Sequence, residues 1–296
     1  MPEFSAPLRV TWELPADPSS AADQWRELVR SRVLFVEIDP APGHLAGLAG
    51  VADLLAVAGA PRVTLAAGAP EATAALAQLS PVGAAAVDLL FLPPHVATAF
   101  PGFAAAFRSV TWALWSTAEG LEWFSGALAA ARAAGGGTVA VRNPPAPAAP
   151  LTPLQRQRAV AEWQRGGAPE LQLKIHDLFL SRDLGLDPFR EYAGCQAGDA
   201  LAHLSAEGVV TACRTLPVVL GTLADKGLRE IWCGEARREL RRRLADAPAP
   251  CAGCAVAGRC RGGCRGLAPG GWGSVNLSAR DPSCPGPLLA GEEGAG

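Results

Sequence analysis

Residues 62–92, RVTLAAGAPEATAALAQLSPVGAAAVDLLFL, hold two short apolar runs separated by a longer alanine-rich segment. The runs at 62–67 and 87–92 have the length and the composition of strands. The segment at 70–79 has the spacing of a helix. Two strands joined by a helix lie parallel in one sheet, so this stretch predicts a strand-helix-strand unit.

The same alternation extends from residue 8 to about residue 177. It predicts strands at 8–14, 32–38, 62–67, 87–92, 109–115, 138–143 and 171–176. The segments between them predict helices at 20–31, 44–59, 70–79, 96–107, 118–137 and 153–167. A strand-helix unit repeated six times indicates an α/β fold in which a parallel sheet curls into a full or partial barrel. The loops after these strands hold no cysteine, no glycine-rich phosphate loop and no paired acid and base.

Composition excludes several classes of protein. The chain has 296 residues, of which 49% are hydrophobic and 18% charged, and its net charge is −2. Such a chain is globular and offers no basic surface for nucleic acid. It has no apolar run long enough to span a membrane and no signal peptide, so we expect a cytoplasmic protein. Cysteines that cluster in a reducing compartment favour metal or redox sites over disulfides.

Four of the eight cysteines lie in CAGCAVAGRCRGGC, residues 251–264, and none precedes Cys195. A Cys-x2-Cys turn brings Cys251 and Cys254 to one metal centre, and Cys260 can close on it after five residues. Cys264 follows after three more residues. In ferredoxin-type runs a cysteine at that spacing serves the other of two clusters, so Cys264 is assigned to another set.

The remaining ligands come from outside this run. Residues 195–213 predict a hairpin, with strands on either side of a turn at 205–208, and a hairpin brings Cys195 and Cys213 together. With Cys264 they form a set of three. Cys284 then completes the set that contains Cys251, so seven thiolates divide as four and three.

The whole pattern resembles the SPASM domain of radical SAM peptide-maturing enzymes. It runs Cys195, twelve residues, Gly208, four residues, Cys213, then Cys-x2-Cys-x5-Cys-x3-Cys and Cys284. The intervening LGTLADKGLREIW (220–232) is similar to the LGxL…LxxIW stretch of that family. The resemblance implies two auxiliary 4Fe-4S clusters, with ligands Cys195, Cys213 and Cys264 for the first and Cys251, Cys254, Cys260 and Cys284 for the second. One iron of the first cluster is open, or is held by water, a substrate group, Asp187 or Cys233.

The N-terminal half resembles the radical SAM superfamily in outline. In that superfamily a Cys-x3-Cys-x2-Cys loop follows the first strand, whereas this chain has PADPSS (15–20) there. A GGEP-like turn normally follows the second strand, and here the sequence is Glu37-Ile38-Asp39-Pro40. The expected architecture is therefore a degenerate partial (β/α)6 radical SAM-like barrel at 1–180, a small SPASM domain at 181–288 and a flexible tail at 289–296. No cluster that binds S-adenosylmethionine is expected.

This resemblance implies an accessory protein of the GeoRSP type rather than an enzyme active on its own, and no residue is assigned a catalytic role. Its expected partners are a separate radical SAM enzyme, a PqqD-like peptide-binding protein and a precursor peptide. Its clusters would relay electrons or engage the substrate. Two alternatives stay open: a scaffold or substrate-binding subunit whose clusters, or zinc ions, are structural, and an enzyme that uses the open iron as a Lewis acid.

Other conspicuous residues have ordinary explanations. The sequence predicts that the four histidines are surface or capping residues, and that Cys233 is a free thiol. The arginines of 236–244 are expected on a solvated helix face. Four tryptophans are expected in the core: Trp12, Trp112, Trp115 and Trp123.

Overall fold

The computed structural model describes residues 4–39, 44–55, 57, 59–92, 106–145, 149–166, 170–186, 194–268 and 275–288. All seven predicted strands are present. They are β1 (Arg9–Glu13), β2 (Phe35–Asp39), β3 (Arg62–Ala67), β4 (Val87–Phe91), β5 (Ser109–Trp115), β6 (Gly137–Arg142) and β7 (Leu171–Ile175). Each pairs with the next in parallel, which confirms the α/β fold.

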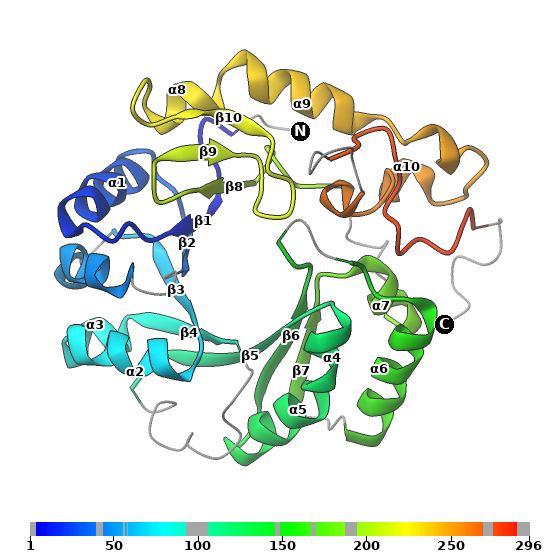
Figure 1. Ribbon diagram of the computed structural model, residues 1–296, viewed down its shortest axis with the longest axis horizontal. Helices are drawn as coiled ribbons and strands as arrows, with labels where there is room; N and C mark the ends of the chain where they lie inside the picture. The colour runs from blue at the N-terminus through cyan, green and yellow to red at the C-terminus, as the bar shows by residue number, and fades with distance from the viewer. Residues whose placement is uncertain are drawn as a thin grey trace.

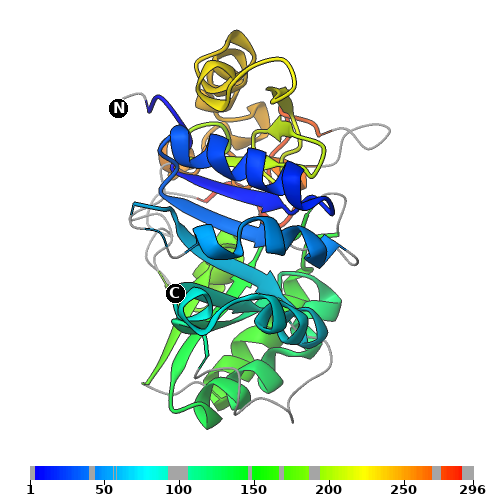
Figure 2. The same cartoon turned by 90° about the vertical axis from the view of Figure 1, so that its left-hand side faces the viewer.

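The sheet curves into a partial barrel that does not close, with helices on its outer side (Figure 1, Figure 2). Alternate side chains point to opposite faces of a strand. On β1, Val10 and Trp12 are buried in the main core. Arg9 and Thr11 instead line the inner cavity. The face toward the helices is therefore apolar on β1, and the inner face of the sheet carries polar side chains beside a small apolar cluster of Ala66, Leu90, Ala113 and Ala140.

Several predicted helices are confirmed. They are α1 (Pro18–Arg30), α2 (Ala69–Gln78), α4 (Ala118–Glu122) with α5 (Phe124–Ala133), and α6 (Pro153–Gly166). The sequence did not indicate the short α3 (Pro81–Ala85) and α7 (Leu178–Asp183). The single helix expected at 44–59 is replaced by the 3-10 turns η1 (His44–Gly50) and η2 (Ala52–Leu54). The helix expected at 96–107 falls largely outside the described residues.

The hairpin predicted at 195–213 is present. Its strands are β8 (Leu201–Leu204) and β9 (Val209–Thr211), which pair antiparallel. A further strand that the sequence did not indicate, β10 (Val219–Thr222), pairs with β9. The hairpin also continues the main sheet, because β8 pairs in parallel with β1. The domain boundary at residue 181 stays a prediction, and the tail at 289–296 lies outside the described residues.

Short helices and turns follow β10 in the chain. They are α8 (Leu228–Trp232), α9 (Glu235–Ala245), η3 (Ala249–Cys251), α10 (Ala257–Cys260) and η4 (Arg265–Leu267). The expectation of a fully solvated arginine face on α9 is wrong. Arg237 is buried, and its Nη1 donates to the Gly198 carbonyl at 3.0 Å.

The tryptophan prediction is correct for Trp12 and Trp112, which are buried in the main core. It is wrong for the other two. Trp115 lines the inner cavity, and Trp123 is 38% exposed. Among the described residues, no helix has the length and apolarity needed to cross a membrane.

Candidate metal centres

The chain reverses direction between Cys260 and Cys264. Arg261, Gly262 and Gly263 have φ values of 50°, 90° and 72°, so three consecutive residues are left-handed. This conformation is costly for Arg261 and easy for glycine. The reversal sends Cys264 away from Cys260, which supports the expectation that the two residues serve different centres.

Cys251, Cys254, Cys260 and Cys284 line one small cavity beside Phe179 and Leu288. The thiol of Cys254 accepts the Leu288 amide at 3.4 Å. This is the predicted set of four, and its members come from η3, the turn after it, α10 and the turn at 284.

The predicted set of three also comes together. Cys195 and Cys213 both lie near enough to Cys264 to raise the pKa of its thiol, and Cys213 raises the pKa of Cys195 in the same way. The two loops that carry Cys213 and Cys264 touch at Gly266, where an added Cβ would lie 2.3 Å from the Thr215 carbonyl oxygen. Only glycine permits this approach.

Helix α9 holds the loop of Cys195 in place. The Arg241 Nη1 donates to the carbonyl oxygens of Cys195 at 2.6 Å and of Ala197 at 3.0 Å. Arg237 anchors the same loop through Gly198. Two arginines of one helix therefore fix the position of a predicted ligand.

Burial favours the protonated form of Cys195, Cys260 and Cys264. It raises the pKa of Cys195 and Cys264, and the neighbouring thiols of their set raise it further. Burial also raises the pKa of Cys260 to about 11, although the amides of Gly262 and Gly263 oppose the shift. Thiolate is the metal-binding form, so binding of iron at these positions releases protons.

The donor atoms suit an iron-sulfur centre because soft thiolates are the usual ligands of such clusters. Within the described ranges, no three cysteine, histidine or carboxylate side chains are close enough to share a single metal ion. Cys233 is exposed, and its thiol contacts the Ser5 carbonyl at 3.9 Å. Asp187, the other residue considered as a fourth ligand, lies outside the described residues.

The inner face of the barrel encloses a cavity of about 810 Å³, and Cys213 is one of its lining residues. The first predicted set therefore borders the barrel interior. Two ion pairs lie inside the barrel. Arg142, the last residue of β6, pairs with Glu37 in the middle of β2 at 2.7 Å, and Arg214 pairs with Asp39, the last residue of β2, at 2.5 Å. Arg214 follows Cys213 directly, so it connects the cysteine region to the barrel.

The ring of Trp115 contacts the guanidinium groups of both arginines in these pairs. The guanidinium carbons of Arg142 and Arg214 lie 5.5 Å and 5.3 Å from the centre of its ring, which is within cation-π range. The sequence did not predict this group. The position of Arg214 next to a ligand and of Trp115 at a strand end were the available signals.

The loop after β1 is short. Four residues, 14–17, separate the end of β1 from the start of α1. Asp17 caps α1 through Ser20, and an added Cβ at Gly47 would lie 1.8 Å from the Pro15 carbonyl oxygen. The eight residues of a Cys-x3-Cys-x2-Cys motif do not fit between these two elements.

One histidine differs from the expectation of surface or capping roles. His203 is buried, and its Nε2 lies 3.4 Å from Glu13 Oε1. Burial lowers the pKa of His203 to about 4. His176 is exposed, as expected, and lines the barrel cavity. His44 bonds to the Leu14 carbonyl at 2.9 Å, and His95 lies outside the described residues.

Residues 195–255 match the SPASM family, an iron-sulfur cluster-binding domain. The matched stretch covers four of the seven predicted ligands, namely Cys195, Cys213, Cys251 and Cys254. No curated protein matches the chain.

The fold is similar to that of solved radical SAM enzymes with SPASM domains. Streptococcus suis SuiB aligns with a TM-score of 0.62 and 12% identity over 95% of this chain and 77% of its own. SuiB bound to its precursor peptide SuiA aligns with a TM-score of 0.61 and 14% identity over 89% and 73%. Native anSMEcpe with bound AdoMet aligns with a TM-score of 0.57 and 11% identity over 91% and 93%. At these identities the likeness concerns the fold.

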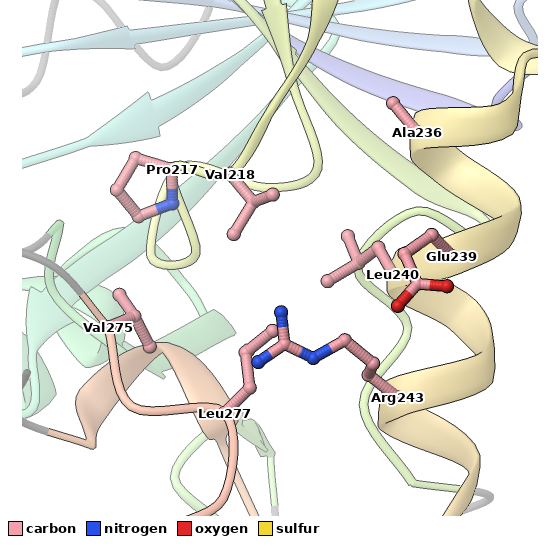
Figure 3. Close-up of a pocket in the computed structure, with 8 residues that line it drawn as sticks. All are labelled: Pro217, Val218, Ala236, Glu239, Leu240, Arg243, Val275 and Leu277. Atoms are coloured by element: carbon pink, nitrogen blue, oxygen red, sulfur yellow. The ribbon is translucent and has the colours of Figure 1, made fainter.

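A separate hollow of about 280 Å³ lies beside α9. Figure 3 shows Leu240 and Arg243 of α9 facing Val218 and Leu277 across it. The predicted ligands do not line this hollow, and we assign it no role in metal binding.

Proposed function

We propose that this protein is an accessory iron-sulfur protein that works beside a separate radical SAM enzyme in the maturation of a peptide or small protein. It carries two 4Fe-4S clusters, the first on Cys195, Cys213 and Cys264, and the second on Cys251, Cys254, Cys260 and Cys284. The clusters relay electrons or engage the substrate. The protein is cytoplasmic, and its further partners are a PqqD-like peptide-binding protein and the precursor peptide.

One observation carries this proposal: seven thiols collect in two groups beside a radical SAM-like barrel whose own strands and loops hold none. The radical SAM superfamily needs three thiolates after the first strand, and here four residues lead directly into a capped helix. This loop supports the proposal that the chain holds no cluster for S-adenosylmethionine and that the radical comes from another protein.

Anaerobic reconstitution tests the clusters. Two 4Fe-4S clusters give about eight irons and eight sulfides per chain. The variants C213S and C254S each remove a ligand of one set and are expected to retain about half of the iron, whereas C233S is the matched control and retains all of it. Zinc without sulfide in the wild-type protein would contradict the iron-sulfur assignment.

The same preparations test the accessory role. With S-adenosylmethionine and dithionite, the chain alone is expected to form no 5′-deoxyadenosine, and formation of this product would overturn the proposal. With a purified radical SAM partner, the electron paramagnetic resonance signal of the reduced clusters is expected to change. Clusters that stay oxidised throughout, with the partner still bound, would favour the scaffold alternative.

A further inference from the structure

Asp281 lies between the two predicted cysteine sets and is 2% exposed. Its Oδ2 accepts the Cys264 amide at 2.9 Å, and its Oδ1 accepts the Ser283 amide at 2.8 Å. Its own amide donates to the Gly262 carbonyl at 2.7 Å, and its carbonyl accepts the Cys284 amide at 3.0 Å. Four hydrogen bonds therefore join one buried residue to a ligand loop of each set.

The surrounding backbone leaves room for this side chain. Gly263 has a φ of 72°, and a Cβ added there would lie 2.7 Å from the Cβ of Asp281. A larger residue at position 263 would displace the carboxylate. The backbone of the loop from Cys260 to Cys264 therefore accommodates the Asp281 side chain as well as the reversal of the chain.

We propose that Asp281 is a positioning residue that fixes the Cys264 loop relative to the Cys284 loop and keeps the reduction potential of the first cluster low. This inference rests on the proposed function, since it assumes that Cys264 binds a cluster. The potential of an iron-sulfur cluster depends on nearby charge and on hydrogen bonds to its sulfurs. The Asp281 carboxylate accepts the Cys264 amide, so this amide cannot donate to a cluster sulfur. The carboxylate also adds negative charge beside the cluster. Both effects lower the reduction potential of the cluster.

The variant D281N tests the inference. It keeps the shape of the side chain, removes the charge and leaves one of the two acceptor oxygens. D246N is the matched control, because Asp246 is an exposed carboxylate in the same region. Redox titration followed by electron paramagnetic resonance is carried out on the full reconstituted chain, with dithionite as the reductant.

The substitution is introduced into C254S, which retains only the first cluster. In this background D281N is expected to give that cluster a more positive reduction potential and an altered spectrum. D246N in the same background is expected to match the parent protein. Equal potentials and spectra in D281N and the parent would overturn the inference.

Hydrogen exchange of the wild-type protein gives a second measurement that needs no variant. The amides of Cys264 and Ser283 are expected to exchange at least about tenfold more slowly than in an unfolded chain. Exchange as fast as in an unfolded chain would overturn the inference. If the wild-type protein binds no iron, the proposed function fails, and the exchange rates still decide whether Asp281 joins the two loops.

Discussion

Arg214 shows how one residue ties the cysteine region to the barrel. It follows the predicted ligand Cys213, pairs with Asp39 at the end of β2 and lies over the ring of Trp115. Its Nη1 is buried without a hydrogen-bond partner among the described residues. Asp39 is half-buried, and desolvation raises its pKa against the opposing charge of Arg214. Charged groups thus converge at the carboxyl ends of the strands, where ligands bind in barrels of this type.

His203 belongs to the same neighbourhood and gives a pH prediction. The imidazole faces Glu13 on β1 and the ion pair of Arg214 with Asp39. Its folded pKa is about 4, against 6.5 in the unfolded chain, so below pH 6.5 the unfolded state binds more protons. The free energy of unfolding is therefore expected to fall as the pH drops from 6.5 toward 4, by up to about 1.4 kcal/mol per unit.

Urea unfolding of the wild-type protein and H203Q between these pH values measures the effect. Asp39 titrates in both proteins, so the difference in slope isolates the imidazole. Equal slopes would show that His203 is not held neutral in the folded protein. The sequence could not indicate this burial, because it depends on the pairing of β8 with β1.

At the scale of elements, the strands and the hairpin were predictable and the environment of the last helices was not. Local composition sets a strand, so all seven predicted strands are present. The arginine-rich α9 buries Leu240 and Leu244 in the main core. Its inward face also binds backbone carbonyls through Arg237 and Arg241, and a pattern of hydrophobic residues cannot reveal such a contact.

Arg237 allows a test of α9. The variant R237M leaves the carbonyls of Trp232 and Gly198 without this donor, so we expect a loss of about 2–4 kcal/mol in the free energy of unfolding. The control is R238M, since Arg238 is exposed and pairs with Glu235 on the same helix. Its expected effect is within about 0.5 kcal/mol. Similar losses in both variants, measured in urea, would contradict the role assigned to Arg237.

Across the whole molecule, the cysteine region is built onto the barrel. β1 pairs with β8, the Leu228 amide donates to Glu27 Oε1 at 2.7 Å, and Gln24 Nε2 donates to the Ala206 carbonyl at 2.9 Å. The four-and-three grouping of the cysteines follows from their spacing along the chain, and it stays a prediction. The contacts of the barrel with the hairpin could not be predicted, because they join residues about two hundred positions apart.

This continuity predicts cooperative unfolding. The metal-free chain is expected to unfold in urea in one transition, with coincident curves from tryptophan fluorescence and far-ultraviolet circular dichroism. A domain boundary at residue 181 that is also a thermodynamic boundary would give two separated transitions. Coincident curves would mean that the boundary divides functions within one folding unit.

The sheet does not close, so β7 and β10 are its outer strands. The unpaired edge of an outer strand can pair with another copy of a protein and lead to aggregation. β7 carries Lys174 along one edge, and charge opposes the addition of another strand. β10 has four residues at the other edge, and its pairing is irregular between Val219 and Gly221. A short, irregular strand is a poor template. Both outer strands therefore oppose the addition of a strand from another copy of the chain.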